Sequence, residues 1–435
     1  MLCGQSARIT LSLWGKLFHV DAIRCRVDNH RTLGEESRVF GKRQRVPVLP
    51  ALPLAVITTL LLIVCSPAHA QTETVLHSFT GIPDGASPQA GLTFYGGNLY
   101  GTTVEGGLDL GRGPGFGTVF ELSPNGSGGW NETVIYKFGS APGDADGASP
   151  NTGLIADSNG NLYGTTEFGG AADCVDGDGC GVAYELSPGP DGWTYTLLHT
   201  FAGNGDGAFP DTGLAMDSKG NLYGGAGDVP TGAVTYELSP SPTGWTEQVI
   251  SNLNCQLTMS ASGDLFCVSY MDIYELSPNG NGGWNQTWIY SFYGGSSTVV
   301  LDQAGNIYGS TYTGPAGNYG IVYKLSPGKH SWKEKTLYTF GNEENGDTPT
   351  GVVLDAGGNI YGTTMFGGLY GGGTVFKLVP PVGRGRFTEK VLVNFNGKDG
   401  QEPYAGVILD NPGNLYGTTN NGGSLGVGTV YEVTP

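Results

Sequence analysis

The segment Gly160-Asn161-Leu162-Tyr163-Gly164-Thr165-Thr166 decides the fold, because this 435-residue chain repeats it, intact or altered, seven times. The other copies begin at Gly97, Gly220, Gly263, Gly305, Gly358 and Gly413. Neighbouring copies lie 42 to 63 residues apart. A period of this length, built from strand-forming residues, is typical of small sheets arranged in a stack or ring rather than of a domain with one core.

The second unit shows how one repeat is expected to fold. Residues 153–157 form a short apolar strand, and a tight turn leads into the returning strand at residues 161–166. A third strand follows at residues 181–188 and a fourth at residues 195–201. Four antiparallel strands of about six residues, repeated in this way, predict an all-β chain made of β-propeller blades.

The two ends of the repeat region indicate how the ring closes. The last unit stops after its third strand, at residues 429–433, whereas residues 74–79 match the fourth strands at 133–138 and 336–340. The N-terminal strand is therefore expected to complete the last blade, which gives a seven-bladed propeller without open strand edges.

The residues before the repeats have the layout of a targeting segment. Basic residues 42–45 precede an apolar run at 46–65, and Ala68-His69-Ala70 follows. This order predicts a secretory signal peptide at 39–70, cleaved before Gln71, with an uncleaved membrane anchor as the competing interpretation. Residues 1–38 are interpreted as an extension from a start codon placed too far upstream, and residues 71–435 as one propeller. We therefore expect a bacterial protein that is secreted, periplasmic or held at the cell surface.

The repeat region is strongly acidic. Residues 1–70 hold nine of the 21 basic and four of the 39 acidic residues, so the remainder carries a net charge near −23. Such a surface repels phosphate backbones, which disfavours nucleic acid as a partner, and it attracts cations or simply keeps the protein soluble. The chain has only six histidines, which disfavours imidazole-based catalysis and histidine-rich metal sites.

Four cysteines remain after the predicted cleavage: Cys174, Cys180, Cys255 and Cys267. An even number in an exported chain predicts two disulfides, one within a small loop and one across neighbouring strands. Zinc is the alternative, but neither pair has Cys-x-x-Cys spacing or a nearby histidine.

Two repeated positions are expected to serve structure. Aromatic residues near the start of the fourth strand should pack between blades together with the tyrosine of each repeated segment. These are Trp130, Trp193, Trp245, Trp284, Trp332 and Phe387. The aspartates of the hairpin turns should accept backbone N–H groups of their own turns. These are Asp157, Asp217, Asp302 and Asp355.

Two further motifs should share one face of the ring, around the channel mouth. One reads Asp-Gly-x-x-Pro-x-x-Gly and begins at Asp84, Asp146, Asp206 and Asp399; the other, Thr-Thr-x-x-Gly-Gly, carries Glu105 and Glu167. The aspartates have three interpretations: shaping of their own loops, calcium binding, and acid–base catalysis. No cofactor is expected in the first instance; calcium is the alternative, with candidate ligands in Asp144, Asp146, Asp176 and Asp178.

The repeat is weakest in its third, fourth and fifth units, which lose the glycine-rich loops. Tyr270, Met271, Tyr312 and Tyr319 lie there and are expected to form a groove beside the channel that suits the stacking of a sugar or peptide. Drift of a tolerant blade is the alternative explanation.

These motifs resemble the GloVer-type (choice-of-anchor) tandem repeat of exported bacterial proteins. The first unit shows the likeness in Asn98 to Thr103, in Gly106-Gly107 and in Gly117 to Pro124, and the resemblance extends over residues 72–435. More distantly, the hairpin Asp-x-x-Gly-Asn-Leu-Tyr is similar to that of NHL, gluconolactonase-like and virginiamycin B lyase-like propellers. The resemblance implies an exported propeller and implies no particular activity.

We therefore expect a binding or scaffolding module for extracellular carbohydrate, peptide or protein. The alternative is a secreted hydrolase or lyase that acts on a glycan or lactone at the channel mouth. No catalytic residue and no oligomeric state is predicted.

Overall fold

The structure is a computed structural model that describes residues 8–13, 16–21 and 71–435, except 110, 112, 171–173, 175–176, 204, 228–231, 315–318 and 342. The chain forms two compact units, Met1–Ala68 and His69–Pro435. In the first unit, strands β1 (Arg8–Leu13) and β2 (Lys16–Asp21) pair as an antiparallel hairpin. The predicted signal peptide lies outside the described residues.

The second unit consists of seven four-stranded antiparallel sheets, as the repeats predict. Blade 1 contains β4 (Thr93–Tyr95), β5 (Asn98–Thr103), β6 (Thr118–Pro124) and β7 (Trp130–Lys137). Blade 2 contains β8 (Ile155–Ala156), β9 (Leu162–Thr166), β10 (Val182–Gly189) and β11 (Gly192–Thr200). Blade 3 contains β12 (Ala215–Met216), β13 (Leu222–Ala226), β14 (Val234–Ser241) and β15 (Gly244–Ser251). Blade 4 contains β16 (Gln256–Met259), β17 (Leu265–Ser269), β18 (Asp272–Pro278) and β19 (Trp284–Ser291).

The remaining blades continue the pattern. Blade 5 contains β20 (Val300–Leu301), β21 (Ile307–Thr311), β22 (Ile321–Ser326) and β23 (Lys333–Thr339). Blade 6 contains β24 (Asp347–Leu354), β25 (Ile360–Phe366), β26 (Thr374–Val379) and β27 (Thr388–Asn394). Blade 7 contains β28 (Ile408–Leu409), β29 (Leu415–Thr419), β30 (Thr429–Thr434) and β3 (Thr72–Ser78). The helical elements described are two short 3-10 turns, η1 (Pro142–Asp144) and η3 (Glu343–Asn345).

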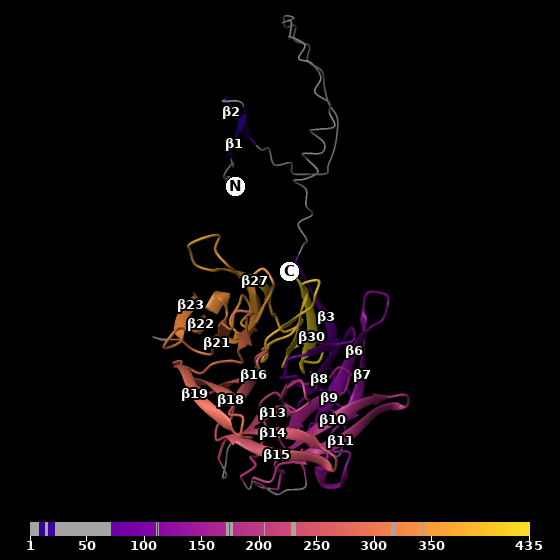
Figure 1. The fold of residues 1–435 in the computed structure, drawn as a ribbon. Helices are drawn as coiled ribbons and strands as arrows, with labels where there is room; N and C mark the ends of the chain where they lie inside the picture. The colour runs from indigo at the N-terminus through magenta and orange to yellow at the C-terminus, as the bar shows by residue number, and fades with distance from the viewer. Residues whose placement is uncertain are drawn as a thin grey trace, which may run out of the picture. The chain divides into compact units, whose positions relative to one another are not determined.

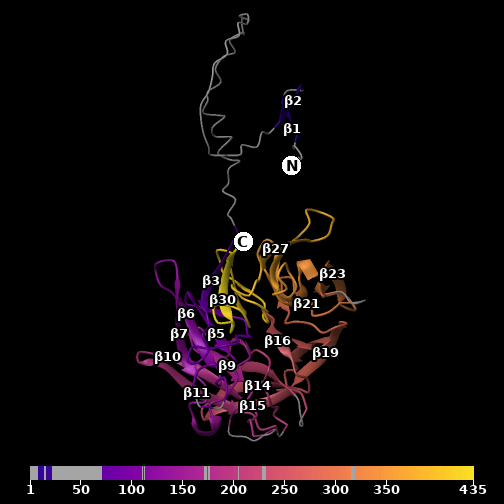
Figure 2. The same ribbon diagram turned by 180° about the vertical axis from the view of Figure 1, so that it is seen from behind.

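The ring closes through its N-terminal strand, as predicted. β3 pairs antiparallel with β30, with Val75 opposite Tyr431. Figure 1 shows the indigo β3 beside the yellow β30, and Figure 2 shows the same neighbours from behind. The first and last parts of the repeat region thus share one sheet, which leaves no blade with a missing outer strand.

Six of the seven innermost strands are shorter than the expected six residues, and four of them contain only two, whereas β24 of blade 6 contains eight. Near the axis, carbonyl groups that would extend these ladders instead accept hydrogen bonds from side chains of a neighbouring blade. Thr102 Oγ1 donates to the carbonyl of Thr152, and Thr418 Oγ1 donates to that of Ala90. The first threonine of the repeated segment therefore ties one blade to the next along the channel.

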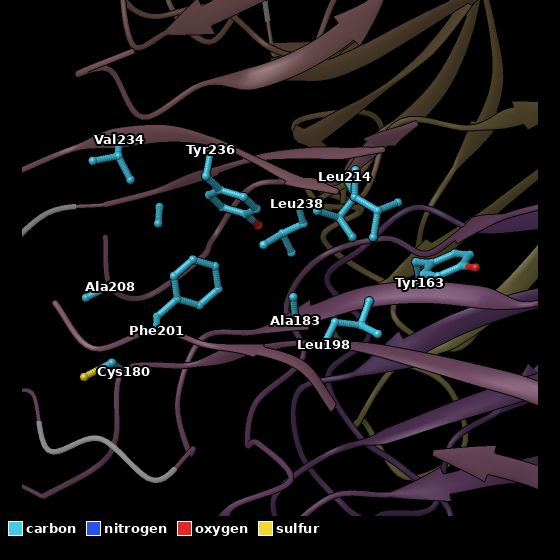
Figure 3. Close-up of a cluster of buried hydrophobic side chains, with 12 residues drawn as sticks. Tyr163, Cys180, Ala183, Leu198, Phe201, Ala208, Leu214, Val234, Tyr236 and Leu238 are labelled. Atoms are coloured by element: carbon cyan, nitrogen blue, oxygen red, sulfur yellow. The ribbon is translucent and has the colours of Figure 1, made fainter. Parts of the chain in front are cut away.

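The core lies between the blades (Figure 3). In six of the seven blades an aromatic residue of the third strand is fully enclosed, as Tyr236 is beside Phe201, with ring centroids 5.0 Å apart, whereas Tyr274 of blade 4 is only partly buried. The repeated glycine makes room for this ring. A Cβ on Gly224 would lie 2.3 Å from the Tyr236 hydroxyl, and one on Gly164 would lie 2.5 Å from that of Tyr184. The glycine of the repeated segment is therefore a packing requirement.

The two structural expectations are confirmed. Asp157 Oδ1 accepts the backbone N–H groups of Asn159 and Asn161, while its Oδ2 accepts the Asn161 amide and the Tyr163 hydroxyl. The aromatic residues pack between blades in edge-on pairs. These pairs are Trp130–Tyr416, Tyr100–Trp193, Tyr163–Trp245, Tyr223–Trp284 and Phe266–Trp332.

Both predicted disulfides are present, Cys174–Cys180 and Cys255–Cys267, with Cα atoms 5.3 Å and 5.0 Å apart. Their presence fits an oxidising compartment outside the cytoplasm. Among the residues that the structure describes, no helix is long and apolar enough to cross a membrane.

Candidate functional site: the channel mouth

The two loop motifs of each blade lie against each other. In blade 1, the backbones of Ala86 and Glu105 exchange two hydrogen bonds, and Ala148 and Phe168 do the same in blade 2. A Cβ on Gly106 would lie 2.5 Å from the Cα of Gly85, so this close approach requires glycine. The predicted grouping of the two motifs on one face is thus explained by direct backbone pairing.

A strained residue then turns the chain toward the channel. A shortened copy of the proline motif lies at residues 345–351 in blade 6. In all five copies the residue before the proline has a positive φ although it is not glycine: Ser87, Ser149, Phe209, Thr348 and Glu402, with φ between 54° and 58°. Each N–H is bonded to a carbonyl of the preceding blade, as Ser149 N is to the Phe116 carbonyl at 2.8 Å. Left-handed backbone in a non-glycine residue is costly and persists only where surrounding contacts hold it. The contact with the preceding blade therefore fixes where the next residues point.

The residues after the motif prolines line a pocket of about 360 Å³ on the channel axis. All seven blades contribute to it, which identifies it as the channel. The inner strands pack closely, since a Cβ on Gly351 would lie 3.3 Å from the backbone of Gly406. The polar side chains that line it differ from blade to blade: Gln89, Asn151, Asp211, Gln256, Thr298, Thr350 and Tyr404.

Two hydrogen-bonded groups form the rim of this mouth. In the first, Asn151 Nδ2 donates to Glu167 Oε2 at 2.9 Å, and Asn254 Nδ2 donates to Asp211 Oδ1 at 2.8 Å. Burial, together with the charge of Asp211, raises the pKa of the Glu167 carboxyl. The rim therefore holds two acidic side chains in different environments, one of which binds its proton more tightly than usual.

The second group lies where the repeat is weakest. Thr298 Oγ1 donates to Gln256 Oε1 at 2.9 Å, and Tyr312 also lines the channel pocket. A neighbouring pocket of about 410 Å³ shares Gln256 and Tyr312 with the channel and adds Tyr270, which is 76% exposed. Tyr270 and Tyr312, two of the four residues expected to form a groove beside the channel, line this pocket, whereas Met271 and Tyr319 are not among its lining residues, and a stacking role stays a prediction.

Blade 4 gives this groove its opening. Its second and third strands are joined by Tyr270 and Met271 alone, because Ser269 pairs with Asp272. Elsewhere this connection is several residues longer; in blade 1 it runs from Thr103 to Thr118. The rim is therefore lowest at blade 4, where it carries an exposed aromatic ring.

The motif aspartates make hydrogen bonds within their own loops. Asp146 is 3% exposed and accepts bonds from Ser140, the Ala141 N–H and the Tyr136 hydroxyl. Asp84 accepts the Thr80 N–H, and Asp399 accepts that of Asn396. Asp206 accepts the N–H of Ala202. These contacts agree with the loop-shaping interpretation, and a ligand role for these aspartates stays a prediction.

The predicted calcium ligands lie in a different place. Asp144 and Asp178 line a pocket of about 580 Å³ between the loops of blades 1 and 2, and Asp176 lies outside the described residues. Asp146 is engaged in its own loop, as above. Glu105 takes part in the blade 1 loop pairing through its backbone. The structure thus divides the predicted site residues among three places, and brings Glu167, Tyr270 and Tyr312 to the channel mouth.

Sequence reasoning missed the residues that line the channel itself, namely Gln89, Asn151, Asp211, Gln256 and Tyr404. The signal was present, since the position after each motif proline changes from unit to unit within a constant frame. This variation does not by itself point to the channel, because the sequence does not show that the left-handed residue before the proline directs the next side chain toward the axis.

A further pocket, of about 820 Å³, lies between the turns of blades 3 and 4 on the opposite face. It is lined by hairpin-turn residues such as Lys219 and Ser262, with Tyr223 and Trp284 from the ladder between blades. Since these two rings already pack against each other, this pocket offers fewer uncommitted groups than the channel mouth.

Fold and site together define a seven-bladed β-propeller repeat protein with a polar channel mouth. A family described as the Gloeobacter/Verrucomicrobia repeat matches residues 63–235 and 254–435, and the chain belongs to this family. A comparison with curated protein sequences gives no match.

Solved structures support the same fold. A streptogramin B lyase is 14% identical, with a TM-score of 0.53, and the match covers 84% of this chain and 97% of the lyase. A catalytically inactive histidine-to-alanine form of virginiamycin B lyase from Staphylococcus aureus, with quinupristin, is 13% identical, with a TM-score of 0.53 and coverage of 84% and 99%. A gluconolactonase from Xanthomonas campestris is 12% identical, with a TM-score of 0.41 and coverage of 85% and 92%. At these identities the likeness establishes the fold alone, and at a TM-score of 0.41 it supports no argument.

Proposed function

We propose that this protein is an exported binding module that takes up a carbohydrate at the channel mouth. The observation that carries the proposal is the ring of polar side chains that line the channel, which vary from blade to blade while the frame around them repeats. A purely structural channel would favour the same side chain in every blade, as the threonines and glycines of the frame show.

The chemistry of the lining favours a hydroxyl-rich ligand. Amide, carboxylate and hydroxyl groups supply donors and acceptors side by side, as in the Gln256–Thr298 pair. The exposed ring of Tyr270 offers a flat apolar surface at the edge of the same groove. Sugars present hydroxyl groups at their edges and apolar C–H faces, so they match both features. The acidic chain disfavours nucleic acid, and the two disulfides fit a protein that acts outside the cytoplasm.

The test measures binding of neutral oligosaccharides from several linkage classes, by calorimetry, to the wild type and to variants of the groove. Gln256→Ala and Tyr270→Ala should each weaken binding about tenfold, because a lost hydrogen bond or stacking contact is worth roughly 1.4 kcal/mol. Ser262→Ala, in the pocket of the opposite face, is the matched control and should bind normally. Binding of peptides in place of sugars, or equal binding by the Gln256 variant, would overturn the proposal.

A second candidate function is a hydrolase or lyase acting at the same mouth, and one observation favours it. Glu167 is specific to its unit, since the matching positions are Val104, Met365 and Asn420. Burial, together with the charge of Asp211, raises the pKa of Glu167, which suits a general acid. An enzyme of this kind would lose turnover in Glu167→Gln while it still bound the sugar. A wild type that binds the sugar and leaves it unchanged would exclude this candidate for that ligand.

A further inference from the structure

Three side chains with metal-binding atoms meet where the ring closes. His77 lies on β3, Asp84 lies in the loop that leads into blade 1, and Glu132 lies on β7, the outer strand of blade 1. One ligand-type atom of each lies within 4.8 Å of the other two, and all three residues are half-buried. The cluster therefore joins the N-terminal strand of blade 7 to the neighbouring blade.

The hydrogen bonds of the cluster orient its ligand atoms. Asp84 Oδ2 accepts the Thr80 N–H at 2.8 Å and the Thr80 hydroxyl at 3.0 Å. These bonds fix the carboxylate, whose two oxygens each lie 3.2 Å from His77 Nε2. Ligand atoms around a small divalent ion bound at about 2.1 Å are separated by roughly this distance. The imidazole and the carboxylate are thus already spaced as a pair of metal ligands.

Glu132 supplies the third atom. Its Oε1 is enclosed and has no hydrogen-bond partner among the described residues. An enclosed carboxylate oxygen without a partner is costly, so a proton or a cation is needed there. Lys137 lies near enough to interact with this carboxyl electrostatically but makes no ion pair with it that the structure describes.

We propose that His77, Asp84 and Glu132 bind one divalent transition-metal ion of the zinc class, which clips β3 to blade 1. One imidazole nitrogen and two carboxylate oxygens form a ligand set that zinc accepts, whereas calcium takes oxygen ligands only. Two carboxylates also balance the charge of a divalent ion. This site is separate from the channel mouth, so it stands independently of the proposed sugar binding.

Two other junctions between blades show that the repeat does not require this ligand set. The same three positions hold Tyr136, Asp146 and Tyr195 between blades 1 and 2, and Val393, Asp399 and Glu73 between blades 6 and 7. The enclosed oxygen recurs at Glu73, Glu247 and Glu389, where a proton is sufficient to explain it. What distinguishes the closing junction is that an imidazole nitrogen, an aspartate oxygen and a glutamate oxygen lie within 4.8 Å of one another.

The junction between blades 2 and 3 provides an internal control. His199, Asp206 and Glu247 occupy the three positions there, with His199 Nε2 3.4 Å from Asp206 Oδ2. Among the described residues, only the cluster at the closing junction brings three such atoms within 4.8 Å of one another. We therefore expect one bound ion per chain and not two.

The test measures zinc retained by the protein, prepared without a histidine tag, after treatment with chelator, reloading with zinc chloride and gel filtration. The wild type should retain about one ion per chain and melt several degrees higher than its chelated form. His77→Gln and Glu132→Gln should each lose the ion, and His199→Gln should keep it. A wild type that retains no zinc, or equal retention by His77→Gln, would overturn the proposal and leave a proton as the occupant. Retained zinc is counted by mass spectrometry in the gel-filtration fraction that elutes at the volume of the folded wild type, so a variant that lost zinc only by unfolding is not counted.

Discussion

Replacing Tyr184 with phenylalanine should stabilise the protein, whereas the same change at Tyr323 should destabilise it. Both tyrosines occupy the enclosed third-strand position between blades, and both are fully buried. The Tyr323 hydroxyl lies 2.7 Å from Ser296 Oγ, whereas the Tyr184 hydroxyl has no partner among the described residues. Phenylalanine is compatible with this position, because Phe120 and Phe376 occupy it in blades 1 and 6.

The magnitude follows from the cost of an enclosed polar group. A buried hydroxyl without a partner costs about 1–3 kcal/mol, and a hydrogen bond that is made contributes about 1 kcal/mol. We therefore expect Tyr184→Phe to raise the free energy of unfolding by about 1 kcal/mol, and Tyr323→Phe to lower it by about the same amount. Because only one oxygen is removed in each case, packing differences between the two variants are small.

Urea unfolding followed by tryptophan fluorescence gives both values, provided that the dependence on urea is the same in all three proteins. The midpoints should move in opposite directions. If Tyr184→Phe lost as much stability as Tyr323→Phe, the Tyr184 hydroxyl would have a partner such as a buried water, and the reasoning would be refuted. Tyr236→Phe, whose hydroxyl also has no partner, repeats the test in another blade.

Three further predictions concern the frame. Gly164→Ala should lower the free energy of unfolding by about 2 kcal/mol, because its Cβ would lie 2.5 Å from the enclosed Tyr184 hydroxyl. Gly213→Ala is the control: its Cβ would meet no atom within 4 Å, so urea unfolding should give nearly the wild-type stability. Burial, followed by the charge of Asp399, raises the pKa of Glu73 from 4.5 to about 7, so the folded state binds more protons than the unfolded state between these values. Glu73 should therefore contribute a fall in stability of roughly 1 kcal/mol, after allowance for solvent screening, as the pH rises from about 5 to 8, and Glu73→Gln should remove this contribution. The pKa values of Glu132 and Glu247 are raised in the same way, so part of the pH dependence should persist in the variant; an identical profile in wild type and variant would show that Glu73 titrates normally. Replacing both Cys255 and Cys267 with serine removes the disulfide that closes a loop of 12 residues and should lower the free energy of unfolding by about 3 kcal/mol. Intact mass with and without reduction counts the disulfides, and unchanged stability would mean that this bond does not form in the wild type.

The repeat predicts much of the frame because each repeated residue has a partner inside its own unit or in the next one. The turn aspartate bonds to the asparagine and tyrosine of its own hairpin, as Asp157 does with Asn161 and Tyr163, so spacing alone reveals its role. The N-terminal strand was predicted to close the ring because its sequence matches that of other fourth strands.

The sequence does not reveal contacts that depend on how one blade meets another. The positive φ of Ser149 comes from its bond to the Phe116 carbonyl of the preceding blade, and a serine before a proline carries no sign of it. His77, Asp84 and Glu132 likewise occupy three different repeat positions, on two strands of neighbouring blades and the loop between them, and their spacing in the sequence does not show that they meet. The scarcity of histidine argued against a metal site, although two of the three described histidines in the repeat region, His77 and His199, lie at the same repeat position.

The position after each motif proline has a consequence for how this protein is able to change. Stability depends on glycines, threonines and aromatic rings that recur in every unit, whereas the chemistry of the mouth depends on one side chain per blade, such as Asn151 or Tyr404. Substitution at a single such position alters one point on the circumference of the mouth and leaves the packing between blades unchanged. A ring organised in this way can acquire a new ligand in single steps, and five such positions can be varied in combination on an unchanged scaffold.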